Sequence, residues 1–223
     1  MIDTPNSSNL QSRKFRSSPH FMPSTAHAAY ETEIARGADI AQYIPVLAWL
    51  RITVFHEFPY LYDGSDEYER EYLKTYLRSN ESLFVLAKDH NKVIGAASGM
   101  PLKLETDEVQ APFLAKGINP EEVFYFGESV LLKQYRGLGI GKVFIREREK
   151  HALSLGYRFT AFCGVQRPDN HPRKPAGYRN LHSFWEMMGY RMQPDMRTTF
   201  SWQDLDENTS SAKEMMFWMK EHS

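Results

Sequence analysis

Apolar positions change their spacing along the chain, and each spacing predicts an element. Apolar residues recur at helical intervals over 38–55, where Pro45 predicts a kink and Asp39 lies near the helix start. Residues 1–26 show no sustained period and are rich in Ser, Asn and Pro, so we expect a flexible tail followed by one domain over 27–223. Further helices are predicted at 64–77, 140–155 and 180–188.

Runs rich in β-branched and aromatic residues predict the strands. The strongest signal is 123–132, VFYFGESVLL, and the run 159–165, FTAFCGV, has the composition of a buried strand. The runs 83–87 and 93–98 flank a polar turn and predict a hairpin. Further strands are expected at 30–36, 197–202 and 215–219, and the segment 102–119 is compatible with a helical insertion. This order predicts an α/β or α+β fold with a single sheet covered by helices.

Composition and charge restrict the function without identifying it. The chain has 223 residues, 42% hydrophobic and 25% charged, and these values exclude collagen-like, mucin-like and wholly disordered proteins. A formal net charge of −1 gives no field that would draw the chain onto nucleic acid or an anionic membrane. The most apolar stretch, 44–55, contains Arg51 and is shorter than the roughly 18 residues of a spanning helix. The single cysteine, Cys163, fits a reducing compartment, so we expect a cytoplasmic protein.

The segment 130–141, VLLKQYRGLGIG, carries the most informative chemistry. It predicts a strand that runs into a glycine-rich turn at a helix N-terminus, where unpaired N–H groups and the positive end of the helix dipole bind phosphate. The spacing does not fit a Walker loop, because Arg136 stands where its first glycine would be and Val143 where its hydroxyl would be. It does not fit the G-x-G-x-x-G dinucleotide fingerprint either, because the glycines are Gly137, Gly139 and Gly141.

The run from Arg136 to Gly141 resembles the R-G-x-G-x-G pyrophosphate-binding signature of the GNAT N-acetyltransferase superfamily. The run 184–190, FWEMMGY, is similar to the family's F-Y-x-x-x-G-F segment. The resemblance covers about residues 28–221 and implies the GNAT acyl-CoA N-acyltransferase fold, in which the single mixed sheet is mostly antiparallel and flanked by helices. It also implies acetyl-CoA (coenzyme A) as the co-substrate.

By this resemblance, the N–H groups of residues 137–141 hold the coenzyme pyrophosphate, and the main-chain N–H near Leu131 polarises the thioester carbonyl. Arg136 and Lys142 add positive charge, and Asn180 contacts the pantetheine arm. The full set of implied coenzyme-binding residues is Leu131, Leu132, Lys133, Arg136, Gly137, Leu138, Gly139, Ile140, Gly141, Lys142, Asn180 and Trp185.

Glu128 is the predicted general base, because transfer needs the neutral amine and an apolar run raises the pKa of a carboxyl group. The alternative is that Glu128 caps or pairs with a neighbouring strand, or faces solvent. In the family a tyrosine of the F-Y pair protonates the departing thiolate, but this chain has Trp185 there, and indole cannot supply a proton. Tyr178 and Tyr190 are the candidate replacements, with core packing as the alternative for either.

The acceptor side carries weaker signals. In the family the connection between the first two helices borders the acceptor pocket, and here 57–71 is acidic, so we expect a cationic small-molecule or peptide amine, with a solvated acidic helix face as the alternative. The acids are Glu57, Asp63, Asp66, Glu67, Glu69 and Glu71. The basic loop of Arg167, Arg173, Lys174 and Arg179 suits the coenzyme 3′-phosphate, an anionic acceptor or simple solvation.

Other reactive residue types carry no predicted chemistry. We interpret Cys163 as a buried apolar residue, and His151 and His171 lack metal-ligand spacing, so we expect no metal site.

These patterns predict an acyl-CoA-dependent N-acyltransferase, most simply an acetyltransferase in which a bound amine attacks the thioester directly in a ternary complex. A non-catalytic acetyl-CoA-binding sensor or regulatory module is the alternative, motivated by Trp185. A third hypothesis is another phosphate-binding protein that uses the same turn. A homodimer is compatible with the resemblance, and the acceptor is not identified by the sequence.

Overall fold

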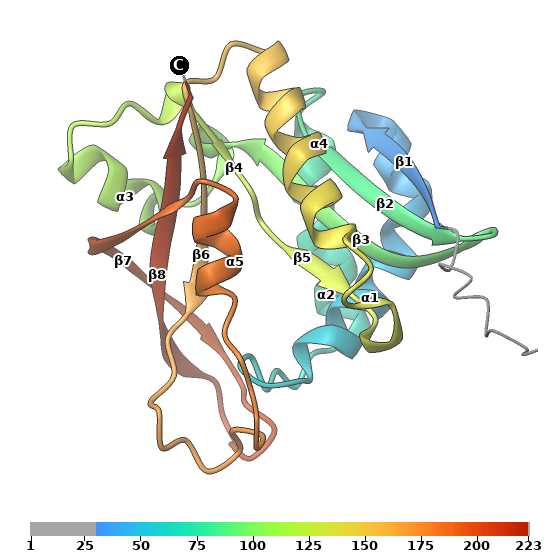
Figure 1. The fold of residues 1–223 in the computed structure, drawn as a ribbon, viewed down its shortest axis with the longest axis vertical. Coiled ribbons are helices and arrows are strands. Elements are labelled where there is room, and N and C mark those ends of the chain that lie inside the picture. The colour runs from blue at the N-terminus through green and yellow to red at the C-terminus, as the bar shows by residue number, and fades with distance from the viewer. Residues whose placement is uncertain (1–29, 223) are drawn as a thin grey trace, which may run out of the picture.

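A mixed sheet forms the frame of the molecule in the computed structural model, which describes residues 30–222 (Figure 1). The tail expected over 1–26 lies outside the described residues. The strands are β1 (Glu31–Arg36), β2 (Leu83–Asp89), β3 (Lys92–Pro101), β4 (Val123–Tyr125), β5 (Ser129–Leu131), β6 (Phe159–Val165), β7 (Arg191–Trp202) and β8 (Ser211–Glu221). Their order is β1-β2-β3-β4-β6-β8-β7, with β5 also paired to β3. Within the described chain β4 and β6 are the only parallel neighbours, so the sheet is mixed and mostly antiparallel, as predicted.

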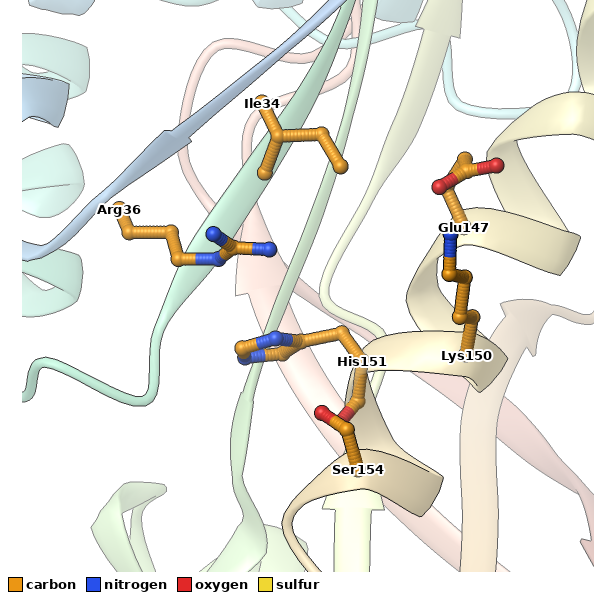
Figure 2. Close-up of a pocket in the computed structure, with 6 residues that line it drawn as sticks. All are labelled: Ile34, Arg36, Glu147, Lys150, His151 and Ser154. Atoms are coloured by element: carbon orange, nitrogen blue, oxygen red, sulfur yellow. The ribbon is translucent and has the colours of Figure 1, made fainter.

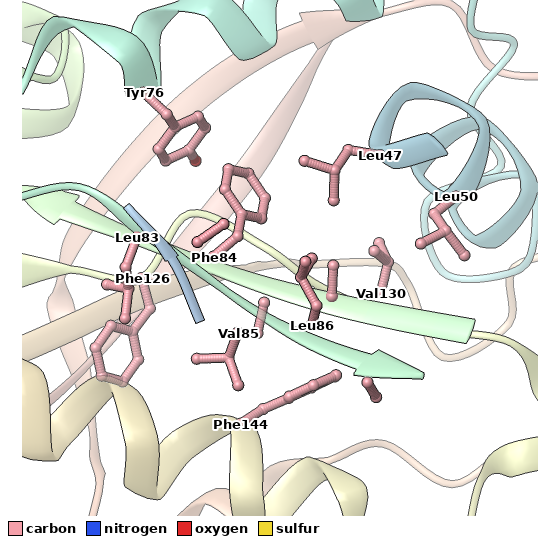
Figure 3. Packing of buried hydrophobic residues seen from close by; sticks show 14 of the residues in the cluster. Leu47, Leu50, Tyr76, Leu83, Phe84, Val85, Leu86, Phe126, Val130 and Phe144 are labelled. Carbon is pink, nitrogen blue, oxygen red and sulfur yellow. The ribbon is translucent and has the colours of Figure 1, made fainter. Parts of the chain in front are cut away.

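Helices cover both faces of this sheet (Figure 1). They are α1 (Ile44–Phe55), α2 (Asp66–Leu73), α3 (Asp107–Ala115), α4 (Ile140–Ser154) and α5 (His182–Met187), with 3₁₀ helices at Gly37–Tyr43 and Lys74–Arg78. Leu47 of α1 packs on one side of β2, and Phe144 of α4 packs on the other side (Figure 3). On β8, Phe217 meets Phe113 of α3, whereas its neighbour Trp218 meets Trp185 of α5. Because successive strand residues point to opposite faces, α3 and α5 lie on opposite sides of the sheet.

The structure confirms the predicted elements and changes some of their bounds. The segment 102–119 does contain a helix, α3, and the predicted strands 197–202 and 215–219 are parts of the longer β7 and β8. The prediction of one continuous strand over 123–132 is wrong, because residues 126–128 separate β4 from β5. This interruption occurs where the site forms.

The sheet divides along the line between β5 and β6. β4 and β6 pair at Val123–Phe159, Phe124–Thr160 and Tyr125–Ala161, and the Phe126 N–H then donates to the Ala161 carbonyl at 2.8 Å. Beyond this point β5 pairs with β3 alone, and the rest of β6 pairs with β8. The two halves of the sheet therefore diverge toward the ends of β5 and β6.

The first helical segment, Gly37–Phe55, is 19 residues long with a mean hydropathy of 1.2, so by length and composition alone it could cross a membrane. One such helix is weak evidence, because the core helix of a soluble protein passes the same test. In this domain Leu47 and Leu50 are buried in the main core, and Arg51 forms ion pairs with Glu69 and Glu128. These contacts tie the helix to the sheet.

Candidate active site

A cavity of about 1430 Å³ lies where β5 and β6 separate. Its walls come from the end of α1 and the connection after it (54–61), the chain between β4 and α4 (126–142), and the end of β6 with the loop that follows (162–182). Small-molecule pockets usually measure roughly 300–1,000 Å³, so this cavity has room for two substrates. The divergence of the sheet, rather than any one motif, creates this space.

The glycine-rich turn forms one wall of the cavity. Gly139 precedes the 15-residue helix α4 with φ of 84°, a left-handed conformation in which other residues are strained. Within the described chain, the N–H groups of residues 137–141 donate to no protein acceptor, and the helical bonds begin with Lys142 N–H to Gly139 O at 3.0 Å. A row of free donors at the positive end of a helix binds an anion.

Leu131 presents its main-chain groups to the same cavity. Ser98 N–H donates to Glu128 O, and Leu132 N–H donates to Ile94 O, each at 3.0 Å, so residues 128, 130 and 132 bond to β3. Bonding alternates along an antiparallel strand, so the N–H and C=O of Leu131 point away from β3. The Leu131 N–H is thus placed as expected for carbonyl polarisation, whereas the Leu132 N–H is already paired.

The structure places the other predicted coenzyme residues unevenly. Lys133, Lys142, Asn180 and Trp185 line the cavity, while Leu132, Leu138 and Ile140 do not. Leu138 and Ile140 therefore contribute to the glycine-rich turn through their unpaired main-chain N–H groups and not through their side chains. The Asn180 side-chain oxygen accepts from His182 N–H at 3.2 Å, at the start of α5.

Arg136 binds a carboxylate in this structure. Its Nη1 and Nη2 donate to the two oxygens of Glu57 at 2.7 and 3.1 Å, and its Nε donates to the Leu131 carbonyl at 3.1 Å. Glu57 belongs to the connection after α1, so this bidentate pair joins the glycine-rich turn to that connection. Lys133 and Lys142 form no ion pair with any described residue.

Glu128 lines the cavity and is 5% exposed. Its Oε2 accepts from Arg51 Nη1 at 2.7 Å and from the Tyr76 hydroxyl at 3.1 Å, while its buried Oε1 has no partner among the described residues. Burial raises the pKa of Glu128 above its ordinary value, and the Arg51 charge opposes this rise. The carboxyl group therefore pairs with Arg51 of α1 rather than with a neighbouring strand, and its second oxygen is buried without a partner in the described structure.

Arg148 of α4 holds the break between β4 and β5. Its Nη1 donates to the carbonyls of Ser98 at 3.0 Å and Glu128 at 3.3 Å, and its Nη2 donates to Ser129 Oγ at 2.8 Å. Sequence reasoning missed this residue. The sequence did carry a signal for a buried charge at this position. Arg148 lies four positions after Phe144 and four before Ala152, so it is on the apolar face of α4.

The structure separates the two tyrosines proposed as proton donors. Tyr178 is half-buried and lines the cavity, and burial raises the pKa of its hydroxyl. Tyr190 is fully buried, pairs with Thr160 Oγ1 at 2.8 Å and does not line the cavity, so its position fits the core-packing alternative. Trp185 lines the cavity and packs between Phe162 and Trp218, each with ring centres 5.0 Å away.

Cys163 also lines the cavity and is half-buried rather than enclosed in the core, which corrects the sequence interpretation. Its Sγ lies 3.0 Å from the Tyr125 hydroxyl, and burial raises the pKa of the thiol to about 12. The thiol form therefore dominates at neutral pH, which does not suit a nucleophile.

Of the acids in 57–71, Glu57 alone lines the cavity within the described structure. Glu69 is buried against Arg51, Asp66 pairs with Arg70 at 2.5 Å, and Glu71 pairs with Lys74 at 2.6 Å. The acidic helix face therefore does not line this cavity.

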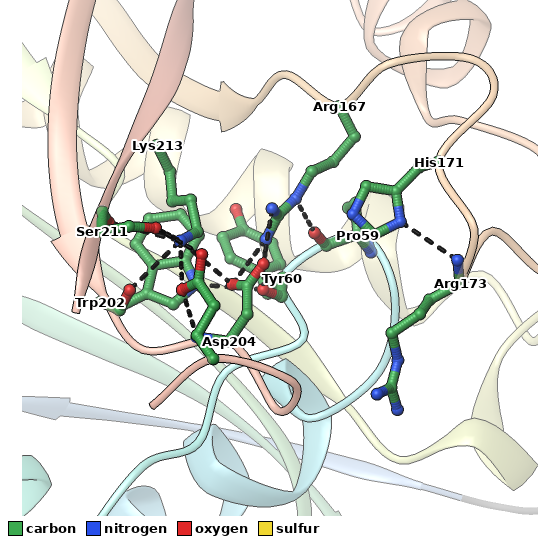
Figure 4. A network of polar contacts seen from close by, with 10 residues as sticks. Pro59, Tyr60, Arg167, His171, Arg173, Trp202, Asp204, Ser211 and Lys213 are labelled. Carbon is green, nitrogen blue, oxygen red and sulfur yellow. Dashed lines mark hydrogen bonds and ion pairs between the residues drawn. The ribbon is translucent and has the colours of Figure 1, made fainter. Parts of the chain in front are cut away.

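Arg167 of the basic loop braces the protein. It donates to the Pro59 carbonyl at 2.8 Å and to the Tyr60 carbonyl at 2.7 Å, and it pairs with both oxygens of Asp204 at 2.7 and 2.8 Å (Figure 4). Lys174 pairs with Asp169 at 3.0 Å. Arg173 and Arg179 line the cavity and form no ion pair with a described residue, so they are the members of this loop left for an anion.

Two further features of residues 30–222 concern metal and ligand binding. No group of three or more His, Cys, Asp and Glu side chains comes together there as a potential metal site. A second cavity of about 100 Å³ lies between β1 and α4, where Arg36 and His151 both reach inward (Figure 2). It shares no lining residue with the large cavity.

A family model described as the Acetyltransferase (GNAT) family matches residues 49–190. The match covers more than half of the chain, and the protein belongs to the GNAT acetyltransferase family. Comparison with curated protein sequences gives no significant match.

Solved structures show the same fold. Ribosomal-protein-alanine N-acetyltransferase from Brucella melitensis has a TM-score of 0.56 at 13% identity and covers 85% of this chain and 99% of its own. An N-acetyltransferase from Staphylococcus aureus has a TM-score of 0.53 at 12% identity, with 86% and 98% covered. NAA60 from Arabidopsis thaliana, in complex with a bisubstrate analogue, has a TM-score of 0.53 at 12% identity, with 86% and 100% covered. At such identities the likeness concerns the fold alone.

Proposed function

We propose that this protein is an acyl-CoA-dependent N-acyltransferase that moves an acetyl group from acetyl-CoA to a primary amine. The observation that carries this proposal is that one cavity joins the unpaired N–H groups of 137–141, the Leu131 main chain and the Glu128 carboxyl group. These groups suit the pyrophosphate, the thioester oxygen and the amine, in that order. Membership of the GNAT family supports acetyl-CoA as the donor.

In the proposed reaction the amine attacks the thioester carbonyl directly while both substrates are bound. Glu128 Oε1 takes a proton from the ammonium, directly or through water, and burial brings the pKa of Glu128 nearer to neutral pH. The Leu131 N–H stabilises the negative charge that develops on the carbonyl oxygen. The C–N bond forms, the C–S bond breaks and the Tyr178 hydroxyl protonates the thiolate, while the second proton that the nitrogen loses restores the Tyr178 hydroxyl through water.

Coenzyme binding is the first test. Acetyl-CoA or coenzyme A at about 100 times its dissociation constant should stabilise the protein by about 2.7 kcal/mol in thermal unfolding, while ATP and NAD should give much less. A folded sample that neither form of the coenzyme stabilises would contradict the proposal.

Glu128→Gln should lower the turnover of any accepted amine by about 10²–10⁴-fold and retain the thermal shift with acetyl-CoA. Tyr178→Phe tests the proton donor in the same assay. An active Glu128→Gln variant would remove this residue from the mechanism. Coenzyme binding without turnover of a broad amine panel would instead indicate a sensor module. The motive for this alternative is that Trp185, which lines the cavity, stands where the family has a proton-donating tyrosine.

A further inference from the structure

Aromatic rings from the end of α1, the connection after it and the loop after β6 line one end of the large cavity. Phe55 and Tyr60 have ring centres 4.5 Å apart, and Phe58 meets Tyr178 edge to face at 4.7 Å. All of these rings line the cavity. We call Phe55, Phe58, Tyr60 and Tyr178 the aromatic wall. It offers an apolar surface of tilted and edge-to-face rings in the same cavity as the glycine-rich turn.

The aromatic wall is held rigidly by the body of the protein. Arg167 binds the carbonyls of Pro59 and Tyr60, and Trp202 Nε1 also donates to Tyr60 O, at 3.1 Å (Figure 4). Leu205 N–H donates to Leu61 O at 2.8 Å, and Leu205 itself lines the cavity. Leu205 therefore joins the aromatic wall to the connection between β7 and β8, which closes this side of the pocket.

One of the acidic side chains around the cavity is buried and keeps an oxygen without a partner among the described residues. The acidic lining residues are Glu57, Glu128 and Asp169 within the described chain. Glu57 is bound to Arg136, and Asp169 is bound to Lys174. Glu128 Oε1 is buried and has no partner there. The cavity is also lined by four cations that form no ion pair with a described residue, Lys133, Lys142, Arg173 and Arg179, and these suit the coenzyme phosphates rather than an ammonium.

We infer that the acceptor is a monoamine whose primary amine is carried on an aromatic body. The ammonium pairs with Glu128 Oε1, and the ring packs on the aromatic wall, where offset or edge-to-face contacts are favourable. A polyamine has to bring in a second ammonium for which the described lining offers no further buried carboxylate oxygen without a partner. This inference rests on the proposed acyltransferase function and narrows its substrate class.

A panel of matched amines tests the inference on the full chain with acetyl-CoA, with acetylated product measured by mass spectrometry. The panel contains 2-phenylethylamine, n-hexylamine and 1,6-diaminohexane. We expect kcat/KM for 2-phenylethylamine to exceed that for n-hexylamine about tenfold and that for 1,6-diaminohexane about 100-fold.

Tyr60→Leu should remove most of the preference for the aromatic amine over n-hexylamine. Trp49→Leu is the matched control, because Trp49 is 44% exposed on α1 and lies outside the cavity. Stabilisation by acetyl-CoA shows that each variant is folded. Acetylation of the diamine or the alkylamine at a rate equal to or faster than that of the aromatic amine overturns the inference alone. Absence of stabilisation by acetyl-CoA, or absence of acetylation of every amine, overturns the proposed function, and the inference with it.

Discussion

Three glutamates gather near one buried arginine beneath the cavity. Glu69 and Glu128 both bind Arg51, and each keeps one buried oxygen without a partner in the described structure. Glu105 is half-buried nearby, and its burial, reinforced by the Glu128 charge, raises the pKa of its carboxyl group to about 7. Such an excess of acids over bases costs stability whenever all of them are ionised.

Glu105→Gln should therefore stabilise the protein in a pH-dependent way. A carboxyl group whose pKa is raised on folding binds its proton more tightly in the folded state, so stability falls as pH rises from about 4.5 to about 7. The neutral amide removes this loss. We expect the variant to be about 1–2 kcal/mol more stable than the parent at pH 8 and nearly equal to it at pH 4, by urea unfolding. The same difference at both pH values would show that the effect is not electrostatic.

The sequence predicts an element well when residues within that element determine its conformation. The glycine-rich turn and α4 follow from residues 136–156 alone, and the structure places both as expected. The break between β4 and β5 could not be predicted, because its cause comes from other parts of the chain. Arg148 binds the carbonyls at the break, and a side chain at Gly127 would lie 2.0 Å from the Tyr76 hydroxyl.

Gly139→Ala should weaken coenzyme binding and cost about 1 kcal/mol of stability, because alanine is strained at φ of 84°. Gly156→Ala is a matched control at the other end of α4. Its φ is 85°, and like Gly139 it has no atom within 4 Å of the added methyl group, so its stability cost should be similar. Urea unfolding and calorimetric titration with coenzyme A check the pair. Equal loss of coenzyme affinity in both variants would argue against the turn as the pyrophosphate site.

The molecule as a whole depends on pairings that span long stretches of sequence. Arg167 reads in the sequence as a member of a basic loop, and its partner Asp204 lies 37 positions away. Asp204 carries no pattern that marks it, so only the folded chain shows that Arg167 is a brace rather than an anion ligand. The acidic run after Glu57 misleads for the same reason, since Glu69 is buried under Arg51 rather than directed at a substrate.

Arg167→Gln and Asp204→Asn should each cost about 3–5 kcal/mol of unfolding free energy, because either leaves a buried group without its partner. The double variant should lose less than the sum of the two. Coenzyme A should still stabilise every variant that remains folded, because Arg167 contacts the aromatic wall rather than the glycine-rich turn. Simple addition of the two losses would mean that the residues are not energetically coupled.

Replacement of Glu57 tests whether its ion pair with Arg136 affects the affinity for coenzyme A. Arg136 has to release Glu57 before it can bind pyrophosphate with both nitrogens, so Glu57→Gln should tighten coenzyme A binding about two- to fivefold. Titration of coenzyme A into the parent and variant proteins at low salt measures this change. Weaker binding by the variant would show that Glu57 instead orients Arg136 for the ligand.

The Glu57–Arg136 pair links the glycine-rich turn to the connection after α1, which carries Phe58 and Tyr60. A coenzyme that takes Arg136 from Glu57 removes one contact of this connection, while its contacts with Arg167 and Trp202 remain. Coupling of this kind is reciprocal, so an amine that tightens the connection lowers coenzyme affinity by the same factor. The two substrates therefore oppose each other's binding through a single ion pair, whichever of them binds first.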